Sequence, residues 1–217
     1  CGEIHYWINM EQGSGNITLI FLPGLTADHR LFEKQIEFFQ GKYNVFVWDA
    51  PGHGKSWPFK FDFSLMDKAK WLDDIFGLEN IQAPVIIGQS MGGYVGQAYS
   101  ELFPNKLKGF VSIDSAPLQR KYVTGIELWL LKRMEPVYRY YPWKSLLNIG
   151  TKGVAVSAYG RKLMHDIMMA YDGDQKRYAQ ISGHGFRILA EAMEADLLYK
   201  VQCPAQLICG EKDHAGS

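Results

Sequence analysis

The chain has 217 residues, of which 47% are hydrophobic, and its 23 Lys and Arg residues are balanced by 23 Asp and Glu residues. This length and composition predict a globular protein with one sizeable core and exclude a disordered or fibrous chain. The net charge of zero gives no overall field that would favour nucleic acid or an anionic membrane. Because no apolar run approaches the roughly 18 residues of a membrane span and no leader pattern opens the sequence, we expect a cytoplasmic protein with no membrane span.

The three cysteines are odd in number and lack the spacing of a disulfide framework. We therefore expect no such framework. Cys203 and Cys209 are interpreted as small buried hydrophobic residues beside or within an apolar strand.

The first half of the chain alternates predicted strands and helices. Apolar runs at 4–8, 17–22, 43–48, 85–87 and 107–113 indicate strands, and most of them lack polar alternation, as in a sheet buried on both faces. Asp28 can cap a helix that ends near Gly41, and Ser64 with Asp67 forms a capping box for the next helix. This alternation predicts parallel strands joined by right-handed crossovers.

Residues 84–94 carry the most informative pattern. The apolar run after Pro84 leads into Gly88-Gln-Ser-Met-Gly92, and helical spacing follows as far as Pro104. A serine on such a hinge is held in a strained backbone conformation, and glycines two positions away prevent collisions with the helix and the neighbouring strands. The G-x-S-x-G pattern therefore predicts that Ser90 is a nucleophile at the carboxyl end of a strand.

The alternation stops at Pro117. Residues 118–185 contain helix-like pieces rich in Trp, Tyr and Met, and an amphipathic helix near 186–197 precedes a last apolar strand at 205–209. We divide the chain into a first core part at 1–117, a helical cap at 118–185 and a second core part at 186–217.

With these patterns in place, the sequence resembles the serine-nucleophile branch of the α/β-hydrolase superfamily with a helical cap. The resemblance covers nearly the whole chain and depends on four motifs in order: Phe21-Leu-Pro-Gly-Leu25, Asp49-Ala-Pro-Gly-His-Gly-Lys-Ser56, Gly88-Gln-Ser-Met-Gly92 and Gly210-Glu-Lys-Asp213. It implies a doubly wound, mostly parallel α/β sheet with the cap inserted after the sixth strand of the family fold.

The resemblance also implies roles for particular residues. The backbone amides of Leu25 and Met91 would form the oxyanion hole, where charge collects during acyl transfer. Asp213 is the expected acid of the catalytic triad, and Asp114 is the alternative. No metal or organic cofactor is implied.

The histidine of the triad follows the acid in this fold, after one further strand. We therefore expect it beyond Ser217, with the last strand missing from this sequence and the chain inactive by itself. Among the histidines present, His184 between Gly183 and Gly185 is the main alternative, because it resembles a glycine-flanked catalytic loop.

The helical cap is expected to supply the substrate pocket. Its aromatic residues and methionines suit an apolar acyl or aromatic group, and Trp129 and Tyr138 are candidate substrate-binding residues together with His29 near the pocket mouth. Between 120 and 162 the cap has nine basic and two acidic residues, so an anionic small-molecule substrate is an alternative.

These observations predict a serine hydrolase that acts on a small ester or lactone through an acyl-enzyme. A C–C bond hydrolase or lyase on a carboxylated substrate is an alternative. A non-catalytic ligand receptor of the same fold is an alternative of a different class, because a fold alone does not determine function.

Overall fold

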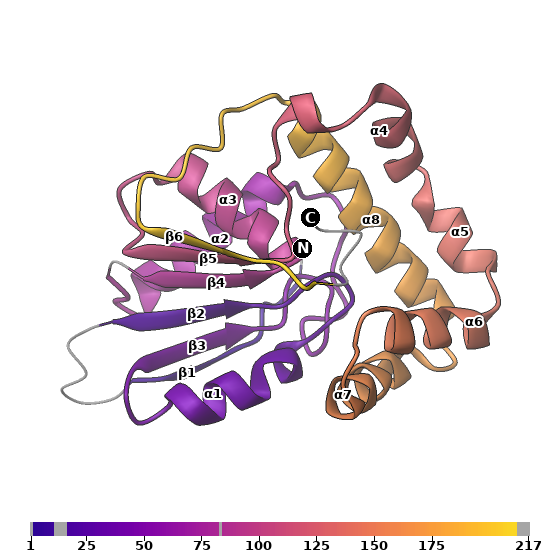
Figure 1. The fold of residues 1–217 in the computed structure, drawn as a ribbon, viewed down its shortest axis with the longest axis horizontal. Helices are drawn as coiled ribbons and strands as arrows, with labels where there is room; N and C mark the ends of the chain where they lie inside the picture. Colours follow the sequence, from indigo (N-terminus) through magenta and orange to yellow (C-terminus); the bar gives the residue numbers. More distant parts are fainter. Residues whose placement is uncertain (1, 11–16, 83, 212–217) are drawn as a thin grey trace.

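The structure is a computed structural model that describes residues 2–10, 17–82 and 84–211. Its centre is a six-stranded sheet with the order β1-β3-β2-β4-β5-β6 (Figure 1). The strands are β1 (Tyr6–Asn9), β2 (Thr18–Leu22), β3 (Asn44–Trp48), β4 (Val85–Gln89), β5 (Gly109–Ile113) and β6 (Ala205–Ile208). Only the edge strand β1 runs antiparallel to its neighbour among these strands, so the predicted mostly parallel α/β sheet is confirmed.

Side chains of the central strands are buried on both faces of the sheet. Ile20 and Leu22 of β2 pack in the same cluster as α2 (Leu65–Leu78) and α3 (Met91–Leu102). Phe21, which points to the opposite face, packs with η1 (His29–Phe32) and next to α1 (Glu33–Phe39). Helices therefore cover both faces, which explains why these strands lack polar alternation (Figure 1).

The predicted helix starts are confirmed at two places. Asp28 accepts a hydrogen bond from the Arg30 amide at the start of η1. Ser64 and Asp67 form a reciprocal capping box at the start of α2. Local side-chain chemistry is sufficient to fix both helix starts, because the capping groups lie within three residues of the amides whose hydrogen bonds they accept.

Between β5 and β6 the described chain is helical. The elements are η2 (Arg120–Tyr122), α4 (Gly125–Leu131), α5 (Met134–Tyr140), α6 (Trp143–Asn148), η3 (Ile149–Gly153), α7 (Ala158–Met168), η4 (Met169–Tyr171) and α8 (Gln175–Glu194). They lie beyond the carboxyl ends of the parallel strands (Figure 1). We call residues 118–194 the helical insertion.

Helix α8 joins the helical insertion to the core. Tyr178 and Ile181 in its first half belong to an apolar cluster with α6 and α7, whereas Ile188 and Met193 in its second half belong to the main core. The division expected at 185 and 186 therefore falls inside one continuous helix. Among the described helices, none has the length and apolar character needed to cross a bilayer.

The interpretation of Cys209 as a buried residue is wrong. Strand β6 is the last in the sheet order, all four of its residues are exposed, and Cys209 directly after it is exposed as well. Cys203 is partly buried, and both thiols are free. The apolar pattern of β6 predicted burial, but the position of the strand at the sheet edge leaves it open to solvent.

Candidate active site

Ser90 lies at the sharp turn between β4 and α3. Its φ of 49° and ψ of −117° place a non-glycine residue in a sparsely populated region of backbone space. The Ser90 amide donates a 2.8 Å hydrogen bond to the Ile113 carbonyl, and the Ser90 carbonyl accepts from the amides of Gly93 and Tyr94. Several bonds therefore hold this conformation, while the residue itself is only partly buried.

The two glycines of the turn are required by close backbone contacts. A Cβ atom on Gly92 would lie 1.9 Å from the Leu22 carbonyl oxygen, and one on Gly88 would lie 2.4 Å from the Gly92 carbonyl carbon. Both obstacles are main chain, so a larger side chain has no room. The sequence pattern predicted that these glycines prevent collisions with the helix and a neighbouring strand, and the structure contains both close contacts.

The turn that follows β2 lies beside the sharp turn at Ser90, which we call the elbow. Strands β2 and β4 are parallel neighbours with Leu22 opposite Gly88, so their carboxyl ends leave the sheet together. A Cβ on Gly24 would lie 2.3 Å from the Gln89 side-chain oxygen and 3.2 Å from its carbonyl oxygen. Leu25, directly after this glycine, is therefore close to the residue that precedes Ser90.

Met91 is the first residue of α3, and its side chain is buried. The amide of a first helical residue has no acceptor inside its helix. The positive end of the α3 dipole also lies at this turn. The two predicted amide donors, Leu25 and Met91, thus come from neighbouring turns at one end of the sheet.

The turn containing Leu25 is held from the insertion side as well. Thr26 has a φ of 63°, and its carbonyl accepts a 3.1 Å hydrogen bond from the Tyr171 hydroxyl. The Leu25 side chain packs against α8, because a Cβ on Gly185 would lie 2.3 Å from Leu25 Cδ1. Sequence reasoning missed Tyr171, since nothing in the local pattern links residues 145 positions apart.

Asp213 and His214 lie outside the described residues, so the expected triad acid keeps its status as a prediction. The alternative, Asp114, has a φ of 50° and accepts a 2.8 Å hydrogen bond from the Gly210 amide. Its own amide donates to the Ile208 carbonyl. Asp114 therefore ties the end of β5 to the turn that leads towards Asp213.

His184 does not lie in a loop. It is buried in α8, where its Nδ1 accepts a 2.8 Å hydrogen bond from Arg187 and its ring packs between Phe61 and Phe63. Burial, reinforced by the positive charge of Lys68, lowers its pKa to about 3. The flanking glycines allow close helix packing: a Cβ on Gly183 would lie 2.4 Å from Glu135 Cβ.

The other described histidines are engaged elsewhere. His29 donates from its ring and its amide to Asp49, with an Nδ1–Oδ1 distance of 2.9 Å, and its ring lies 3.9 Å from that of Trp7. His53 is buried with its Nδ1 3.1 Å from the Pro51 carbonyl oxygen, and burial lowers its pKa to about 3. His5 and His165 are exposed. Within the described part of the chain, no hydrogen bond joins a histidine to Ser90.

The helical insertion covers Leu25 with an apolar cluster. Its buried members are Leu146, Met168, Tyr171, Tyr178 and Ile181, and Leu25, Phe61, Tyr138 and Trp143 pack against them. Tyr138 thus lies in the same cluster as Leu25, and its ring stacks on Phe186 at 5.9 Å. Trp129 is instead 55% exposed, with Arg133 over its ring.

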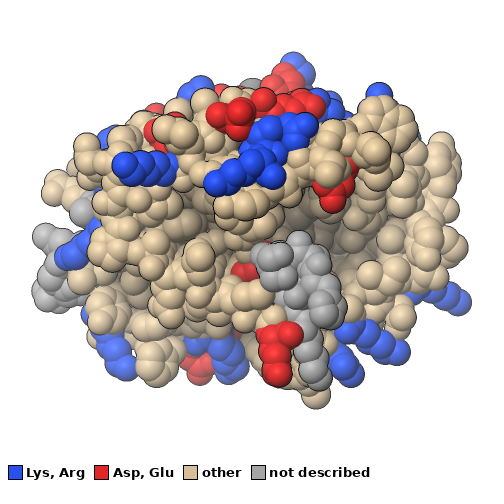
Figure 2. All heavy atoms as spheres, turned by 45° about the horizontal axis from the view of Figure 1, so that its top comes forward, with Lys and Arg blue, Asp and Glu red and all other residues tan. Residues whose placement is uncertain are grey.

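The basic excess of the insertion is partly neutralised by nearby carboxylates. Ion pairs join Lys132 to Glu194, Arg139 to Glu135 and Lys162 to Asp166. Along the upper edge of the face displayed in Figure 2, Lys and Arg side chains lie among Asp and Glu side chains. A continuous basic surface is therefore not visible on that face.

Comparison with known proteins places this geometry in a family. The sequence profile of the alpha/beta hydrolase fold matches residues 17–136. The chain is 31% identical to 3-oxoadipate enol-lactonase 2 of Acinetobacter baylyi in an alignment of 208 positions that covers 90% of this chain and 71% of that enzyme. It is 26% identical to the pimeloyl-[acyl-carrier protein] methyl ester esterase of Wigglesworthia glossinidia brevipalpis over 55% of this chain, and the match spans 45% of that enzyme.

A solved structure extends the agreement to nearly the whole fold. A thermophilic esterase from Thermogutta terrifontis has a TM-score of 0.78 with 15% sequence identity, and the match covers 98% of this chain and 76% of that one. The profile match to more than half of the chain, together with the 31% identity to the lactonase over 90% of this chain, leads to one conclusion. The chain belongs to the alpha/beta hydrolase fold family.

Proposed function

We propose that this protein is a serine hydrolase that cleaves a small ester or lactone. The observation that carries the proposal is the strained turn at Ser90 beside the turn that contains Leu25. The similarity to an enol-lactonase and to a methyl ester esterase supports ester or lactone bonds as the class of substrate.

In the proposed mechanism, the Ser90 hydroxyl oxygen attacks the substrate carbonyl while a histidine removes its proton. The resemblance assigns this general base to a histidine that follows Asp213 in chain order, with Asp213 orienting it. Negative charge on the former carbonyl oxygen is stabilised by the amides of Leu25 and Met91. The leaving alcohol takes the proton, and water then releases the acid from the acyl-enzyme by the reverse proton transfers.

The apolar cluster around Leu25 supports an apolar acyl group as the part of the substrate bound there. Tyr138 is proposed to contact it, since it packs in that cluster. His29 is proposed to act only at the mouth, because both its amide and its Nδ1 are engaged by Asp49.

The test is hydrolysis of a panel of short-chain acyl esters and lactones by the full-length protein and two serine variants of it. We expect Ser90→Ala to lower kcat/KM by about 10⁴-fold or more. Ser145→Ala on α6 removes the same hydroxyl outside the proposed site, and we expect it to retain activity. A folded Ser90→Ala variant with full activity would exclude the serine mechanism. A well-folded wild-type protein that binds these compounds without turnover would favour the receptor alternative.

A further inference from the structure

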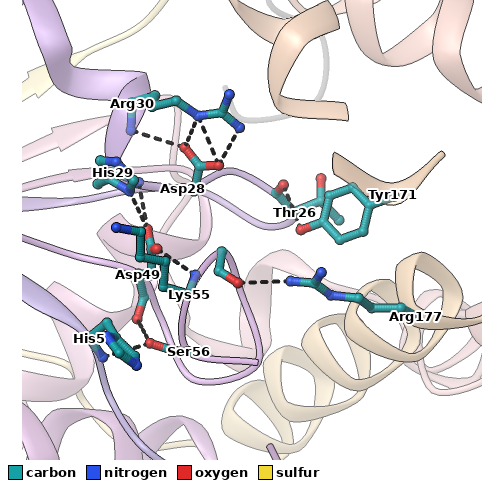
Figure 3. A network of polar contacts seen from close by, with 11 residues as sticks. His5, Thr26, Asp28, His29, Arg30, Asp49, Lys55, Ser56, Tyr171 and Arg177 are labelled. Atoms are coloured by element: carbon teal, nitrogen blue, oxygen red, sulfur yellow. Dashed lines mark hydrogen bonds and ion pairs between the residues drawn. The ribbon is translucent and has the colours of Figure 1, made fainter. Parts of the chain in front are cut away.

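A cavity lies beside the turn that contains Leu25 and Thr26. Its volume is about 270 Å³, and it is lined by the start of η1, by the loop from Asp49 to Ser56 and by the η4–α8 region of the helical insertion. Tyr171 is one of its walls and donates to the Thr26 carbonyl. Figure 3 shows the polar groups of the three segments converging from different sides. Of the residues that line this cavity, His29 is the one named in the proposed hydrolysis, at the mouth of the substrate pocket.

The carboxylates of this cavity are already saturated by donors. Asp28 accepts from the Arg30 amide at 3.0 Å and from the Arg30 guanidinium at 2.6 Å. Asp49 accepts from the amide and Nδ1 of His29 and, at 2.7 Å, from the Lys55 amide. Although burial alone would raise the pKa of Asp49, these hydrogen bonds hold it below its ordinary value.

Because the Asp28 and Asp49 carboxylates already accept these hydrogen bonds, the cavity is better suited to an anionic ligand than to a cation. Asp28, His29 and Asp49 offer ligand atoms within 4.8 Å of one another, a grouping that a metal ion could use. However, His29 Nδ1 and the Asp49 oxygens are occupied by one another and by amides, and Asp28 is paired with Arg30. A metal ion would have to displace these bonds, so the acidic groups support the loops and do not form an open cation site.

The cations of the cavity keep unused donors. The Arg177 guanidinium donates once, to the Gly54 carbonyl at 3.0 Å, and stacks on Trp57 and Tyr171. Its Nε is buried with no hydrogen-bond partner among the described residues. The Lys55 ammonium lies 5.2 Å from the Trp7 ring, and in the described part of the chain neither cation has an ion pair with a carboxylate. The cavity therefore offers surplus positive charge and N–H groups.

We propose that this cavity binds an oxyanion, a carboxylate or a phosphate group, on Arg177, with Lys55 adding positive charge to the same cavity. A guanidinium provides parallel N–H donors for such a group. The Arg177 guanidinium lies over two aromatic rings, with its Cζ 4.9 Å from the Trp57 centroid and 5.1 Å from the Tyr171 centroid. The oxyanion is either the charged end of the substrate or a separate ligand. Binding of an oxyanion to this cavity does not depend on the proposed hydrolase function. The possibility that the oxyanion is the charged end of the substrate does rest on that function.

The experiment measures binding of inorganic phosphate and of succinate by calorimetry at low ionic strength. We expect Arg177→Gln to weaken binding at least tenfold and Lys55→Gln to weaken it several-fold. Arg177→Lys, which keeps the charge, is expected to retain part of the affinity. Lys144→Gln removes an exposed charge from α6 outside the cavity and should bind as the wild type does.

Equal affinities in the wild type, Arg177→Gln and Lys55→Gln would overturn the proposal, as would the absence of binding of both anions to the wild type. Should Arg177→Gln fail to fold, Lys55→Gln and Arg177→Lys still provide the test. The source is resolved by kinetics with a succinate half-ester and a neutral ester of equal length. A rise of KM in Lys55→Gln for the half-ester alone identifies the substrate as the source, whereas unchanged KM values with weakened phosphate binding identify a separate ligand.

Because phosphate binding is measured without turnover, failure of the oxyanion site and failure of the proposed hydrolysis give different results. A protein that hydrolyses no ester but binds phosphate through Arg177 would retain the site and lose only the hydrolase proposal. A protein that hydrolyses esters through Ser90 but binds neither anion would retain the hydrolase proposal and lose the site.

Discussion

The elbow region and the helical insertion place their functional groups in different ways. At the elbow, backbone contacts backbone, as the 1.9 Å approach of a Gly92 Cβ to the Leu22 carbonyl oxygen shows. In the insertion, short helices pack mainly through side chains, and large apolar residues such as Ile126 and Tyr140 remain 74% and 81% exposed. The difference implies that the position of Ser90 tolerates little change, whereas the helices of the insertion can vary without loss of the fold.

The largest effect is expected from a methyl group added at the elbow. Gly92→Ala forces main chain apart, so we expect it to lower the free energy of unfolding by about 4 kcal/mol or more, or to prevent folding. Gly125→Ala is the matched change in the insertion: its Cβ would meet nothing nearer than 3.9 Å, and it should stabilise α4 by about 0.5 kcal/mol. Urea denaturation of both variants measures the contrast, and similar effects would contradict it.

The next effect concerns pH and tests how firmly α8 belongs to the core. Burial lowers the pKa of both His53 and His184 to about 3, so between pH 6.5 and 3 the unfolded chain binds more protons than the folded one. Stability must therefore fall as the pH falls, by about 2 kcal/mol per histidine between pH 7 and pH 5.

Denaturation at the two pH values measures this loss. His184→Gln should remove the part of this stability loss that one histidine contributes. His165→Gln, at an exposed position, should leave the pH dependence of stability unchanged. An unaltered pH dependence in His184→Gln would mean that α8 opens locally and protonates His184 without global unfolding.

A smaller effect is expected where the two regions are joined. Tyr171→Phe removes the hydroxyl that donates to the Thr26 carbonyl, at a cost of about 1 kcal/mol in stability. Because Thr26 follows a proposed oxyanion donor, we also expect kcat to fall by about tenfold with little change in KM. Tyr140→Phe, on an exposed ring, is the control. An unchanged kcat in Tyr171→Phe would show that the insertion does not position this turn.

Much of the core could be predicted from the sequence because its determinants are local. The elbow glycines and the Ser64–Asp67 capping box act on atoms a few residues away, so a short pattern contains the whole argument. The buried strands were recognisable for a similar reason, since helices on both faces require continuous apolar runs.

The insertion was less predictable because its contacts join distant residues. The bonds from Tyr171 to Thr26 and from Arg177 to Gly54 cross 145 and 123 positions, and no local pattern announces them. The glycines beside His184 suggested a loop, but they make room for Glu135 and Leu25 against a helix. Glycine permits both a turn and a close approach, and only the tertiary contacts distinguish the two.

The most direct test of the account is the site of covalent labelling by a fluorophosphonate. An activated serine oxygen attacks the phosphorus of the reagent, its proton passes to the general base, and fluoride leaves. Mass spectrometry of the digested protein then locates the phosphonyl group. We predict a single modified peptide containing Ser90, and no labelling of Ser90→Ala. Labelling at another residue, or a folded full-length protein that stays unmodified, would contradict the assignment of Ser90 as the nucleophile.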